Sequence, residues 1–530
     1  MLIHRLFTPN PANSLLAGFF SGSRKMLAVC GLLAAMASPV KAEPWFSPGH
    51  RFVPGNLIVT ESVYAGTSSL ITPGTTLLPN GATATADGSY PFVFNNESPD
   101  PSFGITAPIF IEQLTREGDL VSKVAVPARL LTTSFSSKSE LAIHPSTEGF
   151  VFNFMGYSSP INTFDVSNSN TPNHFDSSNP VTATFQRAIG QVDRWGNVSA
   201  RPVDAYSGNN GRSVILSNWI YYMVGNAGNG TIKGAQNIVD NTGVQIASPF
   251  SGAETTVVGQ LQGTVGAAKG YQYGFSVTQL GLPADNSGKD DNFRGETIFN
   301  NTLFVSKGSG GNGINTVYQV GATHVLPTFA SAATTQISIL PGFPTALAKS
   351  TTDKIYFPFG LWFADAKTLY VADEGDGVIG NAATGTGGLQ KWILVGGTWQ
   401  LAYTLTAGLN LGQPYAVANY PTGINPTTGL DWAPATDGLR NIVGKQNRNG
   451  TVTIYAITST VSGATDQGAD PNRLVEITDH LSYTTDSQAS GEQFKTIKTA
   501  LSGAVLRGVS FVTEPSDDRS DRDNENDSEE

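Results

Sequence analysis

The clearest strand pattern in the chain lies at 357–405, FPFGLWFADAKTLYVADEGDGVIGNAATGTGGLQKWILVGGTWQLAYTL. This stretch holds four short apolar runs, GLWF (360–363), TLYV (368–371), LQKWI (389–393) and WQLAY (399–403), which Gly- and Asp-rich turns separate. Short aromatic and β-branched runs bounded by turn residues are typical of β-strands. Four consecutive antiparallel strands form a meander, the unit from which a β-propeller blade is built. We therefore expect residues 357–405 to form one blade.

The same pattern recurs along the chain: a basic residue, a small or polar residue, an apolar run, a turn and a second apolar run. It begins at residues 138, 212, 294, 359, 440 and 507. The copies are about 65 to 82 residues apart, against roughly 40 to 45 for a compact blade. The surplus goes into long loops such as 64–108 and 165–180. We predict an all-β fold, a single β-propeller of six blades; a seventh, degenerate blade over 271–282 remains an alternative.

The sixth copy lacks its second apolar run, because the chain becomes acidic after Pro515. A matching run, NLIVT (56–60), is present near the other end, and residues 109–113 and 120–124 can supply a third and a fourth strand. A blade shared between the N- and C-terminal segments would close the ring and protect edge strands that would otherwise be exposed. The complementary ends therefore favour a closed ring.

Composition limits the class of protein. Charged residues make up 14% of the 530 residues, 58 residues are glycine, and the formal net charge is −11. Low charge and abundant glycine are typical of a turn-rich extracellular β-protein. Nucleic-acid binding needs a basic surface, so we expect no nucleic-acid partner.

The N-terminus has the features of an export signal. Arg24 and Lys25 precede the apolar run 26–37, and the sequence Val40-Lys-Ala42 fits a small-x-small cleavage pattern. Residues 1–42 are therefore predicted to be a signal peptide, which places the protein in the periplasm or outside the cell. The run is too short to span a bilayer comfortably, so no transmembrane segment is expected after cleavage.

The rest of the chain is expected to form one domain with a tail. Residues 43–515 form the propeller domain, and residues 516–530 are an acidic tail predicted to be disordered. Cys30 is the one cysteine of the chain and lies inside the signal. An alternative interpretation makes it a lipoprotein cysteine; otherwise the mature chain has no disulfide and depends on packing.

Several motifs together resemble a known family. They are FPFGLWFAD (357–365), TLYVADEGDG (368–377), DNFRG (291–295) with GINTVYQ (313–319), and LRGVS (506–510). The chain resembles a family of exported bacterial proteins that are predicted β-propellers and usually carry no assigned activity. The resemblance covers nearly the whole mature chain. It implies the fold and export, and it implies no catalytic residue.

The aligned basic position is the strongest candidate for a site. The first strand of each blade lines the axis of a propeller, so residues just before it should form a ring at one mouth of the channel. The predicted ligand-binding residues are Lys138, Arg212, Arg294, Phe359, Arg440 and Arg507. One interpretation is an anion-binding funnel for a carboxylated sugar, a phosphate or a similar small molecule or glycan. The other is that nearby carboxylates neutralise the ring, namely those of Glu140, Asp290, Asp291, Glu296 and Asp437.

A second candidate is the acidic loop DEGDG, which should open on the same face. Asp373, Glu374 and Asp376 are closely spaced carboxylates among glycines, and such oxygens can bind Ca²⁺. The spacing differs from that of an EF-hand loop. The alternatives are a solvated turn or a set of ion-pair partners for the basic ring. The histidines show no spacing typical of metal ligands.

We interpret the sequence as an exported β-propeller that acts as a binding or scaffolding module. The rival hypothesis is an enzyme of the same fold, a hydrolase, lyase or quinone-dependent oxidoreductase, that uses the same mouth. A third is a surface or matrix protein whose long loops contact partners, and it predicts an exposed apolar patch away from the axis. Fold alone does not distinguish these, because propellers host all of them.

Overall fold

The structure, a computed structural model, describes residues 51–64, 67–85, 104–134, 140–228, 240–259, 261–262, 274–275, 290–426, 428–463 and 470–513. The chain divides into two compact units, Met1–Trp45 and Phe46–Glu530, and all described residues belong to the second. The predicted signal peptide, the predicted acidic tail and Lys138 lie outside the described residues. Within the described part of the chain, no helix has the length and apolar character needed to cross a membrane.

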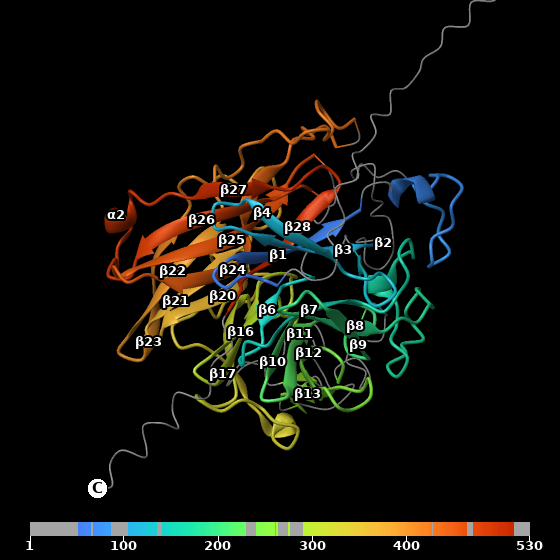
Figure 1. Cartoon of the computed structure of the whole chain (residues 1–530), viewed down its shortest axis with the longest axis horizontal. Coiled ribbons are helices and arrows are strands. Elements are labelled where there is room, and N and C mark those ends of the chain that lie inside the picture. The colour runs from blue at the N-terminus through green and yellow to red at the C-terminus, as the bar shows by residue number, and fades with distance from the viewer. Residues whose placement is uncertain are drawn as a thin grey trace, which may run out of the picture. The chain divides into compact units, whose positions relative to one another are not determined.

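Six four-stranded antiparallel sheets form a ring, and they are the blades of a β-propeller (Figure 1). The predicted fold class and the count of six are confirmed. The first three blades comprise β28 (Ala504–Phe511), β1 (Leu57–Val63), β3 (Ile109–Leu114) and β4 (Leu120–Ala125); β6 (His144–Pro145), β7 (Val151–Tyr157), β8 (Arg187–Asp193) and β9 (Val198–Val203); and β10 (Gly211–Ser217), β11 (Ile220–Gly225), β12 (Gly243–Ala247) and β13 (Thr256–Val258).

The other three blades follow in chain order. They comprise β16 (Gly295–Phe299), β17 (Thr302–Lys307), β18 (Thr316–Val320) and β19 (Ile337–Ile339); β20 (Pro358–Asp365), β21 (Thr368–Asp373), β22 (Gly388–Val395) and β23 (Thr398–Leu405); and β24 (Ala435–Gln446), β25 (Thr451–Val461), β26 (Arg473–His480) and β27 (Lys495–Thr499). The 357–405 stretch thus forms the β20–β23 blade, as predicted.

Short elements outside the blades complete the fold. They are two small sheets, β2 (Thr106–Ala107) with β5 (Thr133–Ser134) and β14 (Leu261–Gln262) with β15 (Gly274–Phe275), and the single turns η1 (Thr67–Leu70), η2 (Val166–Asn168), η4 (Ala332–Thr334) and α2 (Asp486–Ala489). Phe275 falls in the 271–282 segment considered for a seventh blade. The part of that segment that the structure describes belongs to the two-stranded β14–β15 sheet.

The shared blade closes the ring as predicted. β28 pairs with β1 from Leu57–Phe511 to Val63–Ala504, so an inner strand from one end of the chain meets a second strand from the other. The carboxylate of Glu112 on β3 accepts hydrogen bonds from Lys123 on β4 and from Lys498 on β27. The Glu112–Lys498 ion pair joins the closing blade to the preceding one.

The apolar core lies between neighbouring blades. Strands alternate their side chains, so each blade presents an apolar face to the next. Phe363 of β20 stacks on Phe299 of β16 with ring centroids 4.8 Å apart, and Trp392 of β22 stacks on Phe343 at 3.9 Å. Trp392 and Trp399 belong to this buried cluster, so these tryptophans are inter-blade core.

One inner strand is much shorter than its neighbours. The sequence predicts a strand at 140–143, but β6 covers only His144 and Pro145. Leu141 has φ of +64°, a conformation that interrupts an extended chain. The Leu141 carbonyl instead accepts a 2.6 Å hydrogen bond from the hydroxyl of Thr60, which lies on β1 in the neighbouring blade. At Leu141, a hydrogen bond between neighbouring blades therefore takes the place of extended strand geometry.

Candidate functional site

The described basic positions lie on or just before inner strands, and Arg440 and Arg507 lie well inside theirs rather than ahead of them as predicted. Arg212, Arg440 and Arg507 belong to β10, β24 and β28, and Arg294 directly precedes β16. All four side chains are buried, with 2% to 8% of their surface exposed. Phe359 on β20 is fully buried as well. We call Arg212, Arg294, Arg440 and Arg507 the arginine cluster.

Glycines after the basic position explain why this end of the channel is narrow. A Cβ at Gly295 would lie 2.3 Å from the carbonyl oxygen of Phe359, and a Cβ at Gly360 would lie 2.5 Å from that of Arg440. Both distances are far below van der Waals contact, so only glycine lets adjacent inner strands approach this closely. The small residue in the repeat is therefore a packing requirement at the axis.

One cavity within the channel is small. This cavity, of about 10 Å³, lies on the axis and is lined by residues of five blades, among them His144, Glu296, Leu361, Ile442 and Val509. Its volume is that of about one water molecule. Burial raises the pKa of Glu296 well above its usual value, and the Ser213 hydroxyl opposes this shift. Burial thus favours the neutral form of this carboxyl group.

Two arginines of the cluster interact with carboxylate groups. Arg440 Nε donates to Glu374 Oε2 at 3.1 Å in a buried ion pair. Arg507 Nε donates to the Ser62 hydroxyl at 3.2 Å, and its charge lowers the pKa of Glu140. Neutralisation by neighbouring carboxylates, one of the two sequence-based interpretations, therefore holds for Arg440.

The polar surroundings of Arg212 differ from those of Arg440 and Arg507. Its Nη1 donates to the Phe293 carbonyl at 2.5 Å, whereas its Nε has no hydrogen-bond partner among the described residues. Burial, followed by repulsion from Arg294, lowers the pKa of Arg212 well below its usual value, and Glu374 acts in the opposite direction. Desolvation and a like charge therefore both act against this guanidinium.

Glu140 forms a second polar centre at this end. Its carboxyl group accepts hydrogen bonds from the Thr133 hydroxyl at 2.6 Å, the Ser134 amide at 3.2 Å and the Tyr157 hydroxyl. Burial raises the pKa of Glu140 to about 7, although these donors and Arg507 lower it. A carboxyl group that titrates near neutral pH can exchange a proton under ordinary conditions.

The acidic loop does not gather its three carboxylates. Asp373 is buried and accepts from the Phe357 and Gly375 amides, both at 3.0 Å, and also from the side chains of Gln390 and Thr386. The Glu374 carboxylate instead forms an ion pair with Arg440. Among the described residues, no group of three or more His, Cys, Asp or Glu side chains is arranged to hold a metal.

Asp376 lies apart from the other two carboxylates. It is exposed, and its oxygens accept from the Val378 amide at 2.8 Å and the Asn381 side chain at 2.6 Å. Asp373 thus organises the loop, Glu374 is an ion-pair partner for the basic ring, and Asp376 caps a solvated turn. Ca²⁺ binding by these residues stays a prediction.

The described chain has four buried basic residues that the sequence did not mark, namely Arg187, Lys307, Lys391 and Arg473. Arg187 is completely buried, and its guanidinium donates to main-chain carbonyls of Ser167, Ser169, Phe185 and Asn209. Lys391 on β22 forms a fully buried ion pair with Asp479 on β26, 2.9 Å apart. Both lie in ordinary strand patterns, Lys391 within β22 and Arg187 as the first residue of β8, so no local signal marks either of them. Arg187 also shows that the 165–180 loop is packed into the protein.

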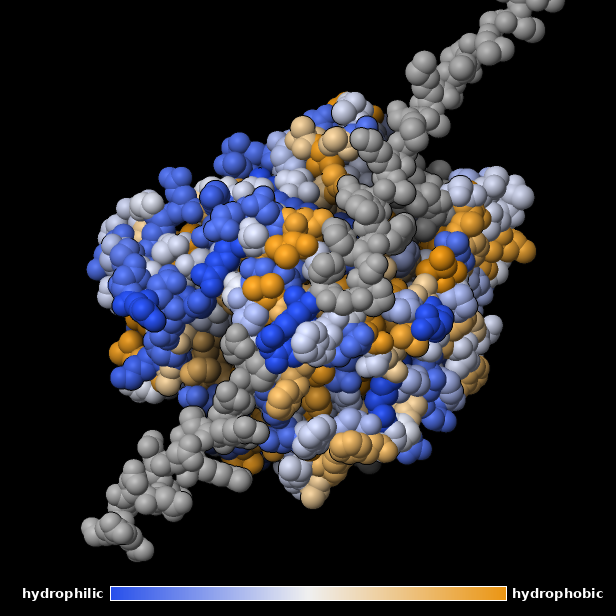
Figure 2. Space-filling view, in the orientation of Figure 1, coloured by the Kyte–Doolittle hydropathy of each residue, from blue (hydrophilic) through white to orange (hydrophobic). Residues whose placement is uncertain are grey.

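Apolar side chains on the face drawn in Figure 2 lie in small groups among polar ones. The exposed large apolar residues of the described chain come from many separate loops and hairpins. This distribution gives no specific support to the surface-protein alternative, which predicts a contiguous apolar patch.

Comparison with known proteins gives no family. No family model matches the chain, and no curated protein matches it. The similar solved structures include a chain of an S. cerevisiae complex of Dbp5, Nup159 and Gle1 with IP6 and ADP, with a TM-score of 0.29, 7% identity, and coverage of 87% of this chain and 95% of that one. They also include a polysaccharide lyase, PL25 ulvan lyase, bound to -[GlcA(1-4)Rha3S]-, with a TM-score of 0.29, 9% identity, and coverage of 76% and 90%. An ACO/RPE65 chimera gives a TM-score of 0.21, 10% identity, and coverage of 76% and 59%.

Proposed function

We propose that this protein is a β-propeller binding module that holds a small anion at the arginine cluster. The observation that carries the proposal is the state of Arg212. Its buried guanidinium has an Nε without a partner in the described chain, and Arg294 repels it. An anion beside Arg212 would supply both the missing acceptor and the missing countercharge.

Burial removes the Arg212 guanidinium from water. A buried charge without sufficient compensation costs several kcal/mol. Guanidinium groups bind carboxylate, phosphate and sulfate through parallel N–H···O hydrogen bonds that are stronger than neutral ones. The ligand class is therefore a small oxyanion, or a sugar that carries a carboxylate, phosphate or sulfate group.

Thermal unfolding with a panel of anions tests the proposal. Phosphate, sulfate, glucuronate and galacturonate are added to the whole protein, with chloride as the reference at equal ionic strength. An anion present at about 100 times its dissociation constant stabilises the folded state by about 2.7 kcal/mol. If none of these anions raises the melting temperature above the chloride reference, the proposal fails.

Two variants assign the effect to Arg212. Arg212→Met replaces a buried charge with an apolar side chain of similar length, so the fold should persist. The anion-dependent shift should disappear in this variant. Arg201→Met is the matched control, because Arg201 donates only to the Pro249 and Gly252 carbonyls in the described chain. A shift that survives Arg212→Met would place the anion elsewhere.

Export is part of the proposed function. The pattern of residues 1–42 supports delivery to the periplasm or the cell exterior by a cleaved signal, where a binding module meets small molecules and glycans.

The enzyme hypothesis has one specific observation in its favour. Glu140, with a pKa raised to about 7, is hydrogen-bonded to Tyr157 and acts electrostatically on Arg507. A carboxyl, a phenol and a cation at one site could provide an acid, a base and an anion-binding group. Incubation with oligogalacturonate and glucuronate-containing oligosaccharides, followed by product analysis, tests it. Turnover that Glu140→Gln abolishes would favour the enzyme over the binding module.

A further inference from the structure

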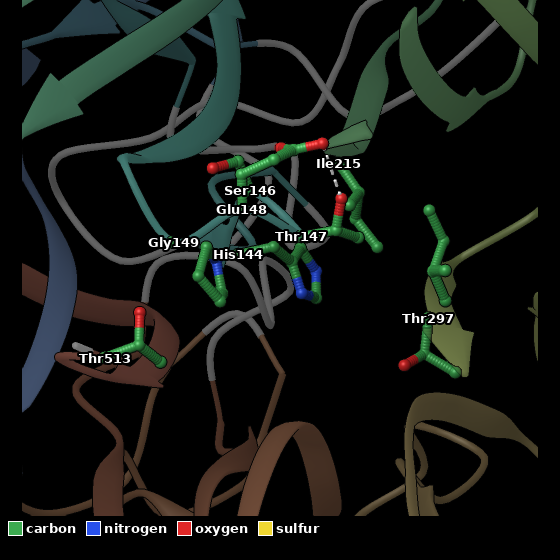
Figure 3. Close-up of a pocket in the computed structure, with 10 residues that line it drawn as sticks. His144, Ser146, Thr147, Glu148, Gly149, Ile215, Thr297 and Thr513 are labelled. Atoms are coloured by element: carbon green, nitrogen blue, oxygen red, sulfur yellow. Dashed lines mark hydrogen bonds between the residues drawn. The ribbon is translucent and has the colours of Figure 1, made fainter. Parts of the chain in front are cut away.

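A second cavity lies at the opposite end of the channel from the arginine cluster. Its volume is about 430 Å³, within the range of about 300 to 1,000 Å³ that small-molecule sites occupy. Figure 3 shows His144, Ile215 and Thr297 facing a common space, with Thr513 at another side. His144 also lines the small axial cavity, so the two spaces are neighbours along the axis.

The lining combines hydrogen-bonding groups with small apolar surfaces. The hydroxyl groups come from Ser146, Thr147, Thr297 and Thr513, the carboxylate from Glu148, and the imidazole from His144. None of the ten described lining residues is a lysine or an arginine. Burial lowers the pKa of His144 to about 4, so this ring is neutral near pH 7. The cavity thus offers polar groups and, at Glu148, a negative charge.

One wall of the cavity is fixed to the turn between β10 and β11. The Thr147 amide donates to the Leu216 carbonyl at 3.0 Å, and the Thr147 hydroxyl oxygen accepts from the Ser217 hydroxyl at 2.9 Å. Glu148 Oε1 accepts from the Asn218 amide at 2.8 Å and from the Thr147 hydroxyl at 3.0 Å, the latter drawn as a dashed line in Figure 3. The next residue along this turn is Trp219.

Trp219 and Phe250 form an exposed aromatic pair beside that wall. The ring centroids are 5.6 Å apart, yet 67% of Trp219 and 77% of Phe250 remain exposed. Phe250 lies between β12 and β13, which are the outer strands of the same blade. The pair therefore lies on the same blade as Ile215 of the lining, its Trp219 follows the Asn218 that bonds to Glu148, and it offers an apolar surface to solvent.

The backbone of Trp219 gives an independent sign of function. Asn218 and Trp219 have φ of +50° and +62°, the conformation of a two-residue turn that favours Asn-Gly. A bulky residue with positive φ is strained, and such strain is often retained where a side chain is needed. The corresponding turn after β16 has Asn300 and Asn301, which tolerate this conformation.

We infer that the 430 Å³ cavity and the Trp219–Phe250 pair together bind a neutral oligosaccharide. One sugar would enter the cavity and hydrogen-bond to its hydroxyl groups and to Glu148, while the next would lie on the aromatic pair. Aromatic faces suit the apolar C–H surface of a pyranose, and hydroxyl and carboxylate groups suit its O–H groups. Glu148, with no cation among the described lining residues, disfavours an acidic sugar. This site is separate from the proposed anion site.

Binding is tested by titration calorimetry with the whole protein. The probes are cellohexaose, xylohexaose, mannohexaose and maltohexaose, and oligogalacturonate is the charged counterpart. At least one neutral probe should bind, and oligogalacturonate should bind more weakly at the same site. If no neutral hexasaccharide binds, or if the charged probe binds more tightly at this site, the inference is overturned.

Variants of the aromatic pair locate the site. Trp219→Gly creates the favoured Asn-Gly turn, so its melting temperature should equal or exceed that of the wild type. Its affinity for the neutral probe should nevertheless fall by about tenfold or more, as should that of Phe250→Ser. Trp195→Ser is the control, because Trp195 is an exposed tryptophan in another blade. Unchanged affinity in Trp219→Gly, or an equal loss in Trp195→Ser, would overturn the assignment. Neither outcome affects the anion proposal, because anion-dependent melting at Arg212 is measured separately.

Discussion

The guanidinium of Arg440 and the carboxylate of Glu374 form a buried ion pair, with Nε 3.1 Å from Oε2. Arg440 lies on β24, whereas Glu374 follows β21 of the preceding blade. That preceding blade is also the one with Phe359 at the aligned basic position. The blade that departs from the sequence repeat therefore contributes negative charge where its neighbours contribute positive charge.

Loss of this ion pair should destabilise the protein. Glu374→Gln leaves the Arg440 charge buried without its carboxylate, and such a change typically costs about 3 to 5 kcal/mol. Urea unfolding monitored by tryptophan fluorescence measures it. Asp376→Asn is the control two residues away: Asp376 is exposed, so its effect should stay within about 0.5 kcal/mol. Equal stability of the two variants would contradict the role assigned to Glu374.

The fully buried Lys391–Asp479 pair makes a second prediction. Lys391→Met alone leaves Asp479 with the Tyr370 and Tyr403 hydroxyls but no countercharge, and we expect a loss of about 3 to 5 kcal/mol. The double variant Lys391→Met with Asp479→Leu should recover part of this loss, because apolar residues can replace a buried ion pair. A double-mutant cycle by urea unfolding measures the recovery. A double variant less stable than Lys391→Met would show that this prediction is wrong.

Glu140 should make stability depend on pH. Its pKa is raised from 4.5 in the unfolded chain to about 7 in the folded protein. The folded state therefore binds more protons between these values, so its stability falls as pH rises from about 4.5 to about 7. A tenfold change in proton affinity corresponds to about 1.4 kcal/mol, so the Glu140 contribution to stability is about 3 kcal/mol.

Comparison with Glu140→Gln isolates that contribution from other groups, such as His144, whose lowered pKa acts in the opposite direction. The variant should gain stability relative to the wild type as pH rises from about 4.5 to about 8. Urea unfolding of both proteins at several pH values measures the difference. A difference that stays constant with pH would show that Glu140 does not titrate in this range.

Export predicts a defined N-terminus. Cleavage after Ala42 gives a mature chain that starts at Glu43. Intact-mass spectrometry of protein recovered from the periplasm or medium measures it. Recovery of a chain that still begins at Met1 would exclude export by this signal.

The fold was largely predictable because strand patterns are local. The apolar runs, the turns between them and the complementary ends identified six blades and the shared closing blade, which β28 and β1 confirm. The exception, β6, is short because Leu141 adopts positive φ to meet Thr60, a contact far away in the sequence. The sequence pattern also missed β13, a strand of only three residues.

The candidate sites were predictable only in part. Repetition predicted the arginines at one end of the channel, because equivalent positions in each blade should face the axis. It did not show that Glu374 pairs with Arg440, or that Arg212 has no ion-pair partner among the described carboxylates, since these depend on side-chain direction in loops. The Trp219–Phe250 pair joins two hairpins 31 positions apart, and no local signal connects them.

Anomalous diffraction from crystals soaked in selenate can locate an anion at the arginine cluster. Selenate is an oxyanion with the shape of sulfate, and selenium marks its position. We expect an anomalous peak beside Arg212, with a selenate oxygen about 2.7 to 3.2 Å from Nε, and no peak there in Arg212→Met crystals. Peaks confined to the outer surface, or a site beside Arg212 occupied only by water, would refute anion binding by this propeller's arginine cluster.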